Sequence, residues 1–208
     1  MTTNGYTGAV SSELIERKSA LRRLVRDKLR AMTDSQRTES SARARALLEL
    51  QEVWIQAKSV LFFAPLPEEL DVWALAEKGL LAGKTVGLPR FERERNSYAA
   101  CEIRNLSSDL RPGQFGIREA SGACPQLSLN RLDLILVPGV AFDSQGRRLG
   151  RGKGFYDQLL AAVQGTTCGV AFDEQIEREV PVEPHDILLD CILTPTRWVS
   201  CSRGAVME

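Results

Sequence analysis

The sequence predicts an α/β fold in which helices cover both faces of a mostly parallel β-sheet. Two observations support this prediction. Short apolar segments with the length of buried strands alternate along the chain with segments of helical periodicity, which is typical of parallel sheets. The 208 residues also suffice for one domain with a substantial core, and no internal repeat or linker divides them.

The N-terminal part of the chain is predicted to form two helices. Residues 1–11 are expected to be a flexible tail, and residues 12–208 a single domain. The first helix is expected over residues 12–32. Its apolar residues recur at helical spacing: Leu14, Leu21, Val25, Leu29 and Met32. A second helix through residue 50 is predicted because Thr33 and Gln36 form a capping-box pattern.

The rest of the chain alternates between strands and helices. Helices are expected at residues 71–82 and 155–163. Strands are expected at residues 59–64, 85–88, 99–103, 132–137, 168–172 and 191–194. Pro89 is expected to end the strand before it, and residues 110–123 are expected to form a loop. Since ligands of such sheets bind at the C-terminal ends of strands, the loop after residue 137 is the first place to look for a site.

That loop combines cationic side chains with glycines and ends in a carboxylate, Asp157. Its cations and glycines are Arg147, Arg148, Arg151, Lys153, Gly146, Gly150, Gly152 and Gly154. Glycines let backbone N–H groups approach an anion closely, and the cations neutralise it. A helix that begins near Phe155 adds the attraction of its N-terminal amides. These components suit a polyphosphate, and Asp157 could hold the metal ion that accompanies it.

The loop matches neither of two common nucleotide-binding motifs. A P-loop needs a glycine at position 147, where this chain has Arg147. It also needs Ser or Thr after the lysine, where this chain has Gly154. In a dinucleotide fingerprint, the third glycine would fall on Phe155. A solvated basic loop without a ligand therefore stays open as the alternative to phosphate binding.

Other polar residues are candidates for the same site. Lys18 lies in phase with the apolar stripe of the first helix, and Arg22 follows one turn later, so Lys18 either extends to solvent or points at an anion. Glu69, between a strand and a helix, could accept hydrogen bonds from a substrate ring. Asp186 or Asp190 could join Asp157 around Mg²⁺, which prefers few carboxylates plus phosphate oxygens.

The composition narrows the class of protein. The formal net charge is zero, which gives no indication of a general affinity for nucleic acid or anionic membranes. The five cysteines are widely spaced and form no C-x-x-C pair, which disfavours a disulfide framework or zinc site and favours a reducing, cytoplasmic compartment. No apolar run approaches transmembrane length. We expect small-molecule partners only, and a monomer or weak dimer.

These motifs together resemble the 5-formyltetrahydrofolate cyclo-ligase family, also called 5,10-methenyltetrahydrofolate synthetases. The resemblance runs from Lys18 to Trp198, and its most specific parts are residues 137–143 and 148–157. It implies a three-layer α/β fold similar to the sugar-phosphate isomerase and CoA-transferase-like group. It also implies ATP-dependent cyclisation of 5-formyltetrahydrofolate to 5,10-methenyltetrahydrofolate, with release of ADP and phosphate and with Mg²⁺.

The resemblance also implies roles for individual residues. The nucleotide contacts are Lys18, Arg22, Arg148, Leu149, Gly150, Arg151, Gly152, Lys153, Gly154, Phe155 and Tyr156. The substrate contacts are Glu69, Arg151, Gly152, Lys153, Gly154 and Phe155. The magnesium positions are Asp157 and Asp186. The cations that would stabilise the negative charge of the transferring phosphoryl group are Lys153, Arg148 and Arg151. Val72 departs from the family, which often has Thr there.

Two other functions compete with this interpretation. A sugar-phosphate isomerase or CoA-transferase-like enzyme could use a similar sheet without nucleotide hydrolysis. A basic module that binds RNA or another polyanion would show aromatic residues interleaved with the basic ones. The three tyrosines and three tryptophans are scattered instead, which disfavours the binding module.

Overall fold

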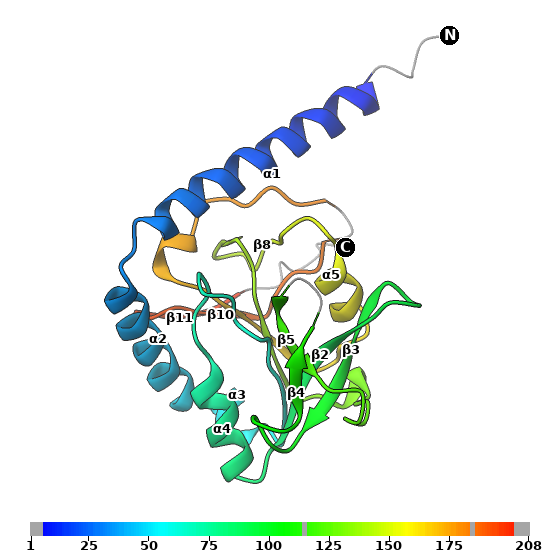
Figure 1. The fold of residues 1–208 in the computed structure, drawn as a ribbon. Coiled ribbons are helices and arrows are strands. Elements are labelled where there is room, and N and C mark those ends of the chain that lie inside the picture. The colour runs from blue at the N-terminus through cyan, green and yellow to red at the C-terminus, as the bar shows by residue number, and fades with distance from the viewer. Residues whose placement is uncertain (1–5, 114–115, 184–185, 202–208) are drawn as a thin grey trace, which may run out of the picture.

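A seven-stranded sheet forms the centre of the molecule. The structure is a computed structural model that describes residues 6–113, 116–183 and 186–201 (Figure 1). The strand order is β11-β10-β9-β6-β1-β2-β3. The strands span β1 Ser59–Leu61, β2 Thr85–Glu92, β3 Ser97–Ile103, β6 Leu134–Val137, β9 Thr166–Val170, β10 Cys191–Leu193 and β11 Trp198–Ser200. The five inner strands are mutually parallel and the two edge strands antiparallel, which confirms the predicted mostly parallel sheet.

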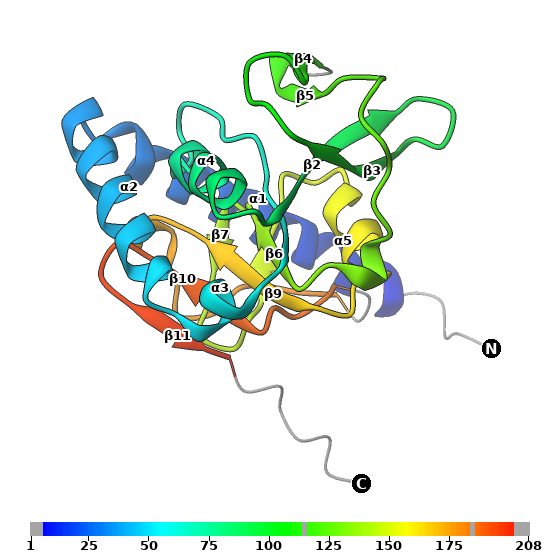
Figure 2. The ribbon, with the colours of Figure 1, turned by 90° about the horizontal axis from the view of Figure 1, so that it is seen from below.

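Helices cover both faces of this sheet and give three layers. The helices are α1 Tyr6–Arg30, α2 Asp34–Glu49, α3 Glu52–Gln56, α4 Trp73–Leu81 and α5 Phe155–Leu160. In β6, Leu134 and Leu136 pack into a core cluster with residues of α1 to α4, whereas Ile135 and Val137 pack into a second cluster with residues of α5. Figure 2 shows α2 and α4 on one side of the sheet and α5 on the other. Since β6 is buried on both faces, it reads as a continuous apolar run.

Helix α1 differs from its predicted limits of 12–32 at both ends, since it spans Tyr6–Arg30. Helix α1 begins at Tyr6, inside the stretch predicted to be a tail, and residues 1–5 lie outside the described residues. Its predicted core residues Val25 and Leu29 are buried. The capping box of α2 is confirmed, because the Gln36 N–H donates to Thr33 Oγ1 (3.2 Å) and the Thr33 N–H donates to Gln36 Oε1 (2.8 Å).

The prediction that Pro89 ends a strand is wrong, because β2 continues through it to Glu92. The neighbouring strand β1 pairs with β2 only as far as Gly87, so none of the described strands pairs with β2 on that side of Pro89. Pro89 pairs with Ala100 of β3, whose C=O points away from β2 and accepts from Leu127 N (2.8 Å). At such a pair the proline nitrogen also faces away from β3, so the missing N–H costs no ladder hydrogen bond.

Two hairpins occur where no strand was predicted. Strands β4 (Leu110–Pro112) and β5 (Arg118–Ala120) form a hairpin inside the stretch predicted to be a loop, in which residues 114–115 lie outside the described residues. Strands β7 (Ala141–Phe142) and β8 (Arg148–Leu149) form the other, within the glycine-rich segment. Short 3-10 helices occupy Leu129–Arg131 and Asp173–Gln175. None of the helices in the described ranges is long and apolar enough to cross a membrane.

Candidate active site

A cavity of about 810 Å³ lies at the C-terminal ends of β1 and β6. Its walls come from α1, from the segments that follow these two strands, from β2, β3 and β5, and from residues 183 and 186. The residues predicted to make nucleotide, substrate or phosphoryl-transfer contacts all line this cavity, although the loop, Glu69 and α1 are far apart in sequence. Gly146 and Arg147, also predicted as part of the anion-binding loop, do not line it, because Arg147 turns away to pair with Asp143 at 2.7 Å. Asp190, the alternative to Asp186, is not among the lining residues. A volume of this size is in the usual range for small-molecule sites.

The glycine-rich loop, residues 150–154, runs along the cavity wall directly after the β7–β8 hairpin. Gly152 and Gly154 have φ angles of 95° and 68°, a left-handed conformation that favours glycine. Gly154 immediately precedes α5, which ends at Leu160, three residues before its predicted end. The two glycines therefore let the chain turn from β8 into α5 while its backbone stays on the cavity wall.

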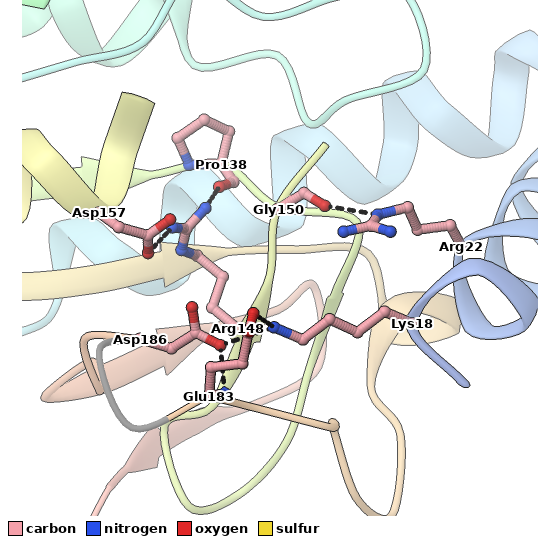
Figure 3. Close-up of polar contacts among 8 residues, drawn as sticks. All are labelled: Lys18, Arg22, Pro138, Arg148, Gly150, Asp157, Glu183 and Asp186. Carbon is pink, nitrogen blue, oxygen red and sulfur yellow. Dashed lines mark hydrogen bonds and ion pairs between the residues drawn. The ribbon is translucent and has the colours of Figure 1, made fainter. Parts of the chain in front are cut away.

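Arg148 is a buried cation whose charge is already paired within the protein. Its Nη2 donates to Asp157 Oδ1 at 2.6 Å, and its Nη1 lies 3.5 Å from the carbonyl oxygen of Pro138 (Figure 3). Its Nε is buried and has no hydrogen-bond partner in the described part of the chain. The guanidinium also lies over the Tyr156 ring, 5.8 Å from its centre. Arg148 thus holds Asp157 and Tyr156 in place at the start of α5.

Lys18 points inward from α1 to two carboxylates. Its Nζ donates to Glu183 Oε2 at 2.8 Å and to Asp186 Oδ2 at 3.0 Å (Figure 3). Burial lowers the pKa of Lys18, but the hydrogen bonds and charges of Glu183 and Asp186 outweigh burial, so the pKa is raised. Of the two positions that the sequence left open for Lys18, the structure shows the inward one.

Arg22, one turn further along α1, contacts the backbone of the glycine-rich loop. Its Nε donates to the carbonyl oxygen of Gly150 at 2.9 Å (Figure 3). Burial lowers its pKa, and the charge of nearby Arg26 adds to that effect. Arg22 therefore ties α1 to the loop and keeps its cationic group at the cavity.

Glu69 is a largely covered carboxylate, 11% exposed, that accepts hydrogen bonds from two donors. Its Oε2 accepts from Leu66 N at 3.0 Å, and its Oε1 accepts from Arg151 Nη2 at 3.0 Å. Burial raises the pKa of Glu69 despite both donors. Burial also raises the pKa of Tyr156, and the negative charge of Glu69 adds to it. The loop and Glu69 are therefore joined by an ion pair across the cavity wall.

Comparison with known proteins assigns the family. A family model described as the 5-formyltetrahydrofolate cyclo-ligase family matches residues 14–195. The chain belongs to the 5-formyltetrahydrofolate cyclo-ligase family. It is 33% identical over 182 residues to the cyclo-ligase of Escherichia coli strain K12, covering 84% of this chain and 98% of that one. It is 32% identical over 194 residues to the cyclo-ligase of Mycolicibacterium smegmatis, covering 89% and 97%.

A solved structure supports the same assignment. The NMR structure of Aquifex aeolicus 5,10-methenyltetrahydrofolate synthetase superposes with a TM-score of 0.80 and 31% identity, covering 92% of this chain and 96% of that one. A synthetase from Mycoplasma pneumoniae shares the fold with a TM-score of 0.69 at 20% identity. The three-layer α/β fold expected from the cyclo-ligase resemblance is thereby confirmed.

The two carboxylates predicted to hold magnesium in this cyclo-ligase family member suit that ion chemically. Asp157 and Asp186 both line the cavity, and each pairs with a cation, Arg148 or Lys18. No group of three or more potential metal-binding side chains exists among the described residues, but Mg²⁺ often binds one or two carboxylates plus substrate phosphates. Asp190 instead accepts from Thr167 N (2.9 Å) and Thr167 Oγ1 (2.8 Å), where it joins β9 to the segment before β10.

Some residues that line the cavity were not foreseen from the sequence. Tyr98 contacts Phe155 edge-on, with ring centres 5.4 Å apart, and Glu119 is a buried carboxylate on β5. Strand β3 begins two residues earlier than predicted, which left Tyr98 outside it. The prediction of a loop over residues 110–123 concealed Glu119.

Val72 provides no side-chain cap for α4, and Asp71 Oδ1 accepts from Trp73 N instead (2.9 Å).

Proposed function

We propose that this chain catalyses the ATP-dependent cyclisation of 5-formyltetrahydrofolate to 5,10-methenyltetrahydrofolate, with release of ADP and phosphate. One observation carries the proposal: a single cavity gathers cations from α1 and from the glycine-rich loop beside the largely covered carboxylate of Glu69. Cations and loop amides suit a nucleotide's phosphates, and a buried carboxylate suits the N–H groups of a reduced pterin. The names of the curated relatives agree with this activity.

The nucleotide is proposed to bind along α1 and the loop, with Lys18, Arg22 and residues 148–156 as its contacts. Lys153 is exposed on the cavity wall, and within the described residues no hydrogen bond or ion pair occupies its side chain. Its ammonium group can therefore meet a phosphate without first breaking an internal contact. Arg151 is half exposed and can approach the same phosphate, whereas Arg148 contributes its charge from within the wall.

The proposed reaction has two steps. The carbonyl oxygen of the formyl group carried by N5 attacks the γ-phosphorus of ATP. The bond from that phosphorus to the β–γ bridging oxygen breaks, and ADP leaves. N10 then attacks the formyl carbon and loses its proton, and the carbon–oxygen bond breaks to release phosphate and leave the methenyl bridge. Lys153, Arg151 and Arg148 stabilise the negative charge on the transferring group, and the cavity holds the reacting atoms together. This chemistry needs no protein nucleophile.

Asp157 and Asp186 are proposed to hold Mg²⁺ together with phosphate oxygens of the nucleotide. When bound, the ion would neutralise part of the phosphate charge. Arg148 keeps Asp157 at the start of α5, and Lys18 keeps Asp186 beside the cavity. Both ion pairs therefore position the carboxylates before any ligand binds.

The folate is proposed to bind at Glu69, with its pterin ring against the aromatic residues at the start of α5. Glu69 is fixed by Leu66 N and would accept hydrogen bonds from pterin N–H groups. Phe155 lines the cavity and is held edge-on by Tyr98 and Phe91, with ring centres 5.4 and 5.3 Å away.

We further propose that the enzyme acts in the cytoplasm on small molecules, as a monomer or weak dimer. The five cysteines, which form no disulfide, support a reducing compartment.

A direct assay tests this function. Purified protein is mixed with Mg²⁺, ATP and 5-formyltetrahydrofolate, and the methenyl product is followed by its absorbance while ADP is measured in the same sample. We expect product only when all components are present. Release of ADP that does not depend on the folate, or no methenyl product from folded protein, would contradict the proposal.

A further inference from the structure

One nitrogen of Arg151 serves two neighbouring carboxylates. Its Nη2 lies 3.0 Å from Glu69 Oε1 and 3.1 Å from Glu68 Oε1. The side chain of Glu69 is 11% exposed, whereas that of Glu68 is 45% exposed. Glu68 does not line the cavity. The structure therefore shows a shared ion pair, with one carboxylate inside the site and one at its edge.

Substrate binding conflicts with this arrangement at Glu69. The pterin is proposed to use the Glu69 oxygen that now accepts from Arg151, and the phosphate is proposed to attract Arg151 itself. Binding must therefore replace the contact between Arg151 and Glu69. Separating a guanidinium from a carboxylate costs free energy when either charged group is left without a hydrogen-bonding or ionic partner. The substrate supplies new donors to Glu69, and Glu68 is the group that can keep hold of Arg151.

We infer that Glu68 is a positioning residue, which keeps Arg151 at the cavity wall when the substrate displaces it from Glu69. The inference rests on the proposed function and deepens it, because it explains how one arginine serves both the empty and the occupied site. Glu68 acts through Arg151 and does not touch the substrate. With Glu68 present, a guanidinium displaced from Glu69 still has an anionic partner.

The charges around Glu69 give this role a measurable signature. The groups that face Glu69 are Arg151, Glu68 and Tyr156, and Arg37 lies near Glu68. Burial raises the pKa of Glu69, Arg151 lowers it, and the negative charge of Glu68 raises it further. Removing that charge leaves Arg151 paired with Glu69 alone. The pKa of Glu69 should then fall. The substrate must also displace an Arg151 that pairs with Glu69 alone and no longer shares its charge with Glu68.

The test replaces Glu68 by glutamine and compares the variant with Glu77→Gln on α4. Glu77 is exposed and makes no hydrogen bond or ion pair with the described residues, so this control changes net charge equally away from the site. We expect Glu68→Gln to raise the KM for 5-formyltetrahydrofolate about two- to fivefold, the change expected for one partly exposed ion pair, with a smaller effect on kcat. The acid limb of the pH profile of kcat/KM should move to lower pH. Glu68→Asp, which keeps the charge, should restore part of both properties.

The outcomes separate this inference from the proposed function. If wild-type protein forms no methenyl product, the function is wrong and the inference falls with it. If wild-type protein is active but Glu68→Gln matches Glu77→Gln in both KM and acid limb, only the inference is overturned. Thermal unfolding of each variant shows whether it is folded. A fall in kcat together with an equal rise in the KM values for ATP and for the folate would mark Glu68 as merely structural. This result would also overturn the inference.

Discussion

Replacing Lys153 by alanine should impair catalysis without affecting folding. The side chain is exposed, and the described residues offer it no hydrogen bond or ion pair. Truncating such a side chain changes the free energy of unfolding by less than about 0.5 kcal/mol. In the proposed reaction, however, Lys153 meets the charge that develops on the transferring phosphoryl group. Removing one well-placed stabilising group of this kind lowers turnover by about a hundred- to a thousandfold.

The assay measures kcat/KM by methenyl absorbance and stability by urea unfolding in the same preparations. Lys58→Ala is the matched control, because Lys58 is an exposed lysine just before β1, at the N-terminal end of that strand and so at the end opposite the cavity. We expect unchanged unfolding for both variants and a large loss of kcat/KM for Lys153→Ala alone. A folded Lys153→Ala protein with near-normal kcat/KM would refute the role of Lys153 in phosphoryl transfer.

Three further predictions concern the ion pairs of the site. Glu69→Gln should weaken folate binding while ATP affinity changes little, as measured by calorimetry, and an equal loss of both would indicate a structural role. Asp157→Asn should lower the free energy of unfolding by about 1–3 kcal/mol, because Arg148 is buried and would lose its charged partner; unchanged urea unfolding would contradict this. The pKa of Lys18 is raised above its ordinary value of 10.5, so its stabilising contribution is fully present below that pH and is lost as the pH rises through the folded-state pKa. The stability difference between wild type and Lys18→Met should therefore be constant near neutral pH and shrink in alkali, whereas a difference that grows there would contradict the assigned sign.

The core of the fold and the site were predictable because their signals are local. The apolar run at β6 has the length and composition of a strand buried on both faces, and Thr33 and Gln36 give the local capping pattern that starts α2. The glycine-rich loop pointed to the cavity that it lines because its residues lie together in sequence. Lys18 was also identified, since its place in an apolar stripe is unusual for a lysine.

The remaining features depend on contacts between distant residues. Pro89 continues a strand only because β1 ends early on one side, and this is invisible in a local pattern. The contact of Arg151 with Glu68 and Glu69 joins segments more than eighty residues apart. The buried carboxylate of Glu119 belongs to a hairpin whose strands are too short to show a period.

The proposed mechanism requires one cavity to bind ATP and 5-formyltetrahydrofolate together and to couple their chemistry. A single-turnover experiment with Mg²⁺ and limiting folate, quenched at successive times, measures ADP and methenyltetrahydrofolate in each sample. The proposed mechanism predicts that both products end in equal amounts and that ADP never lags behind the methenyl product. Methenyl product formed without ADP, or ADP formed in the absence of folate, would contradict it.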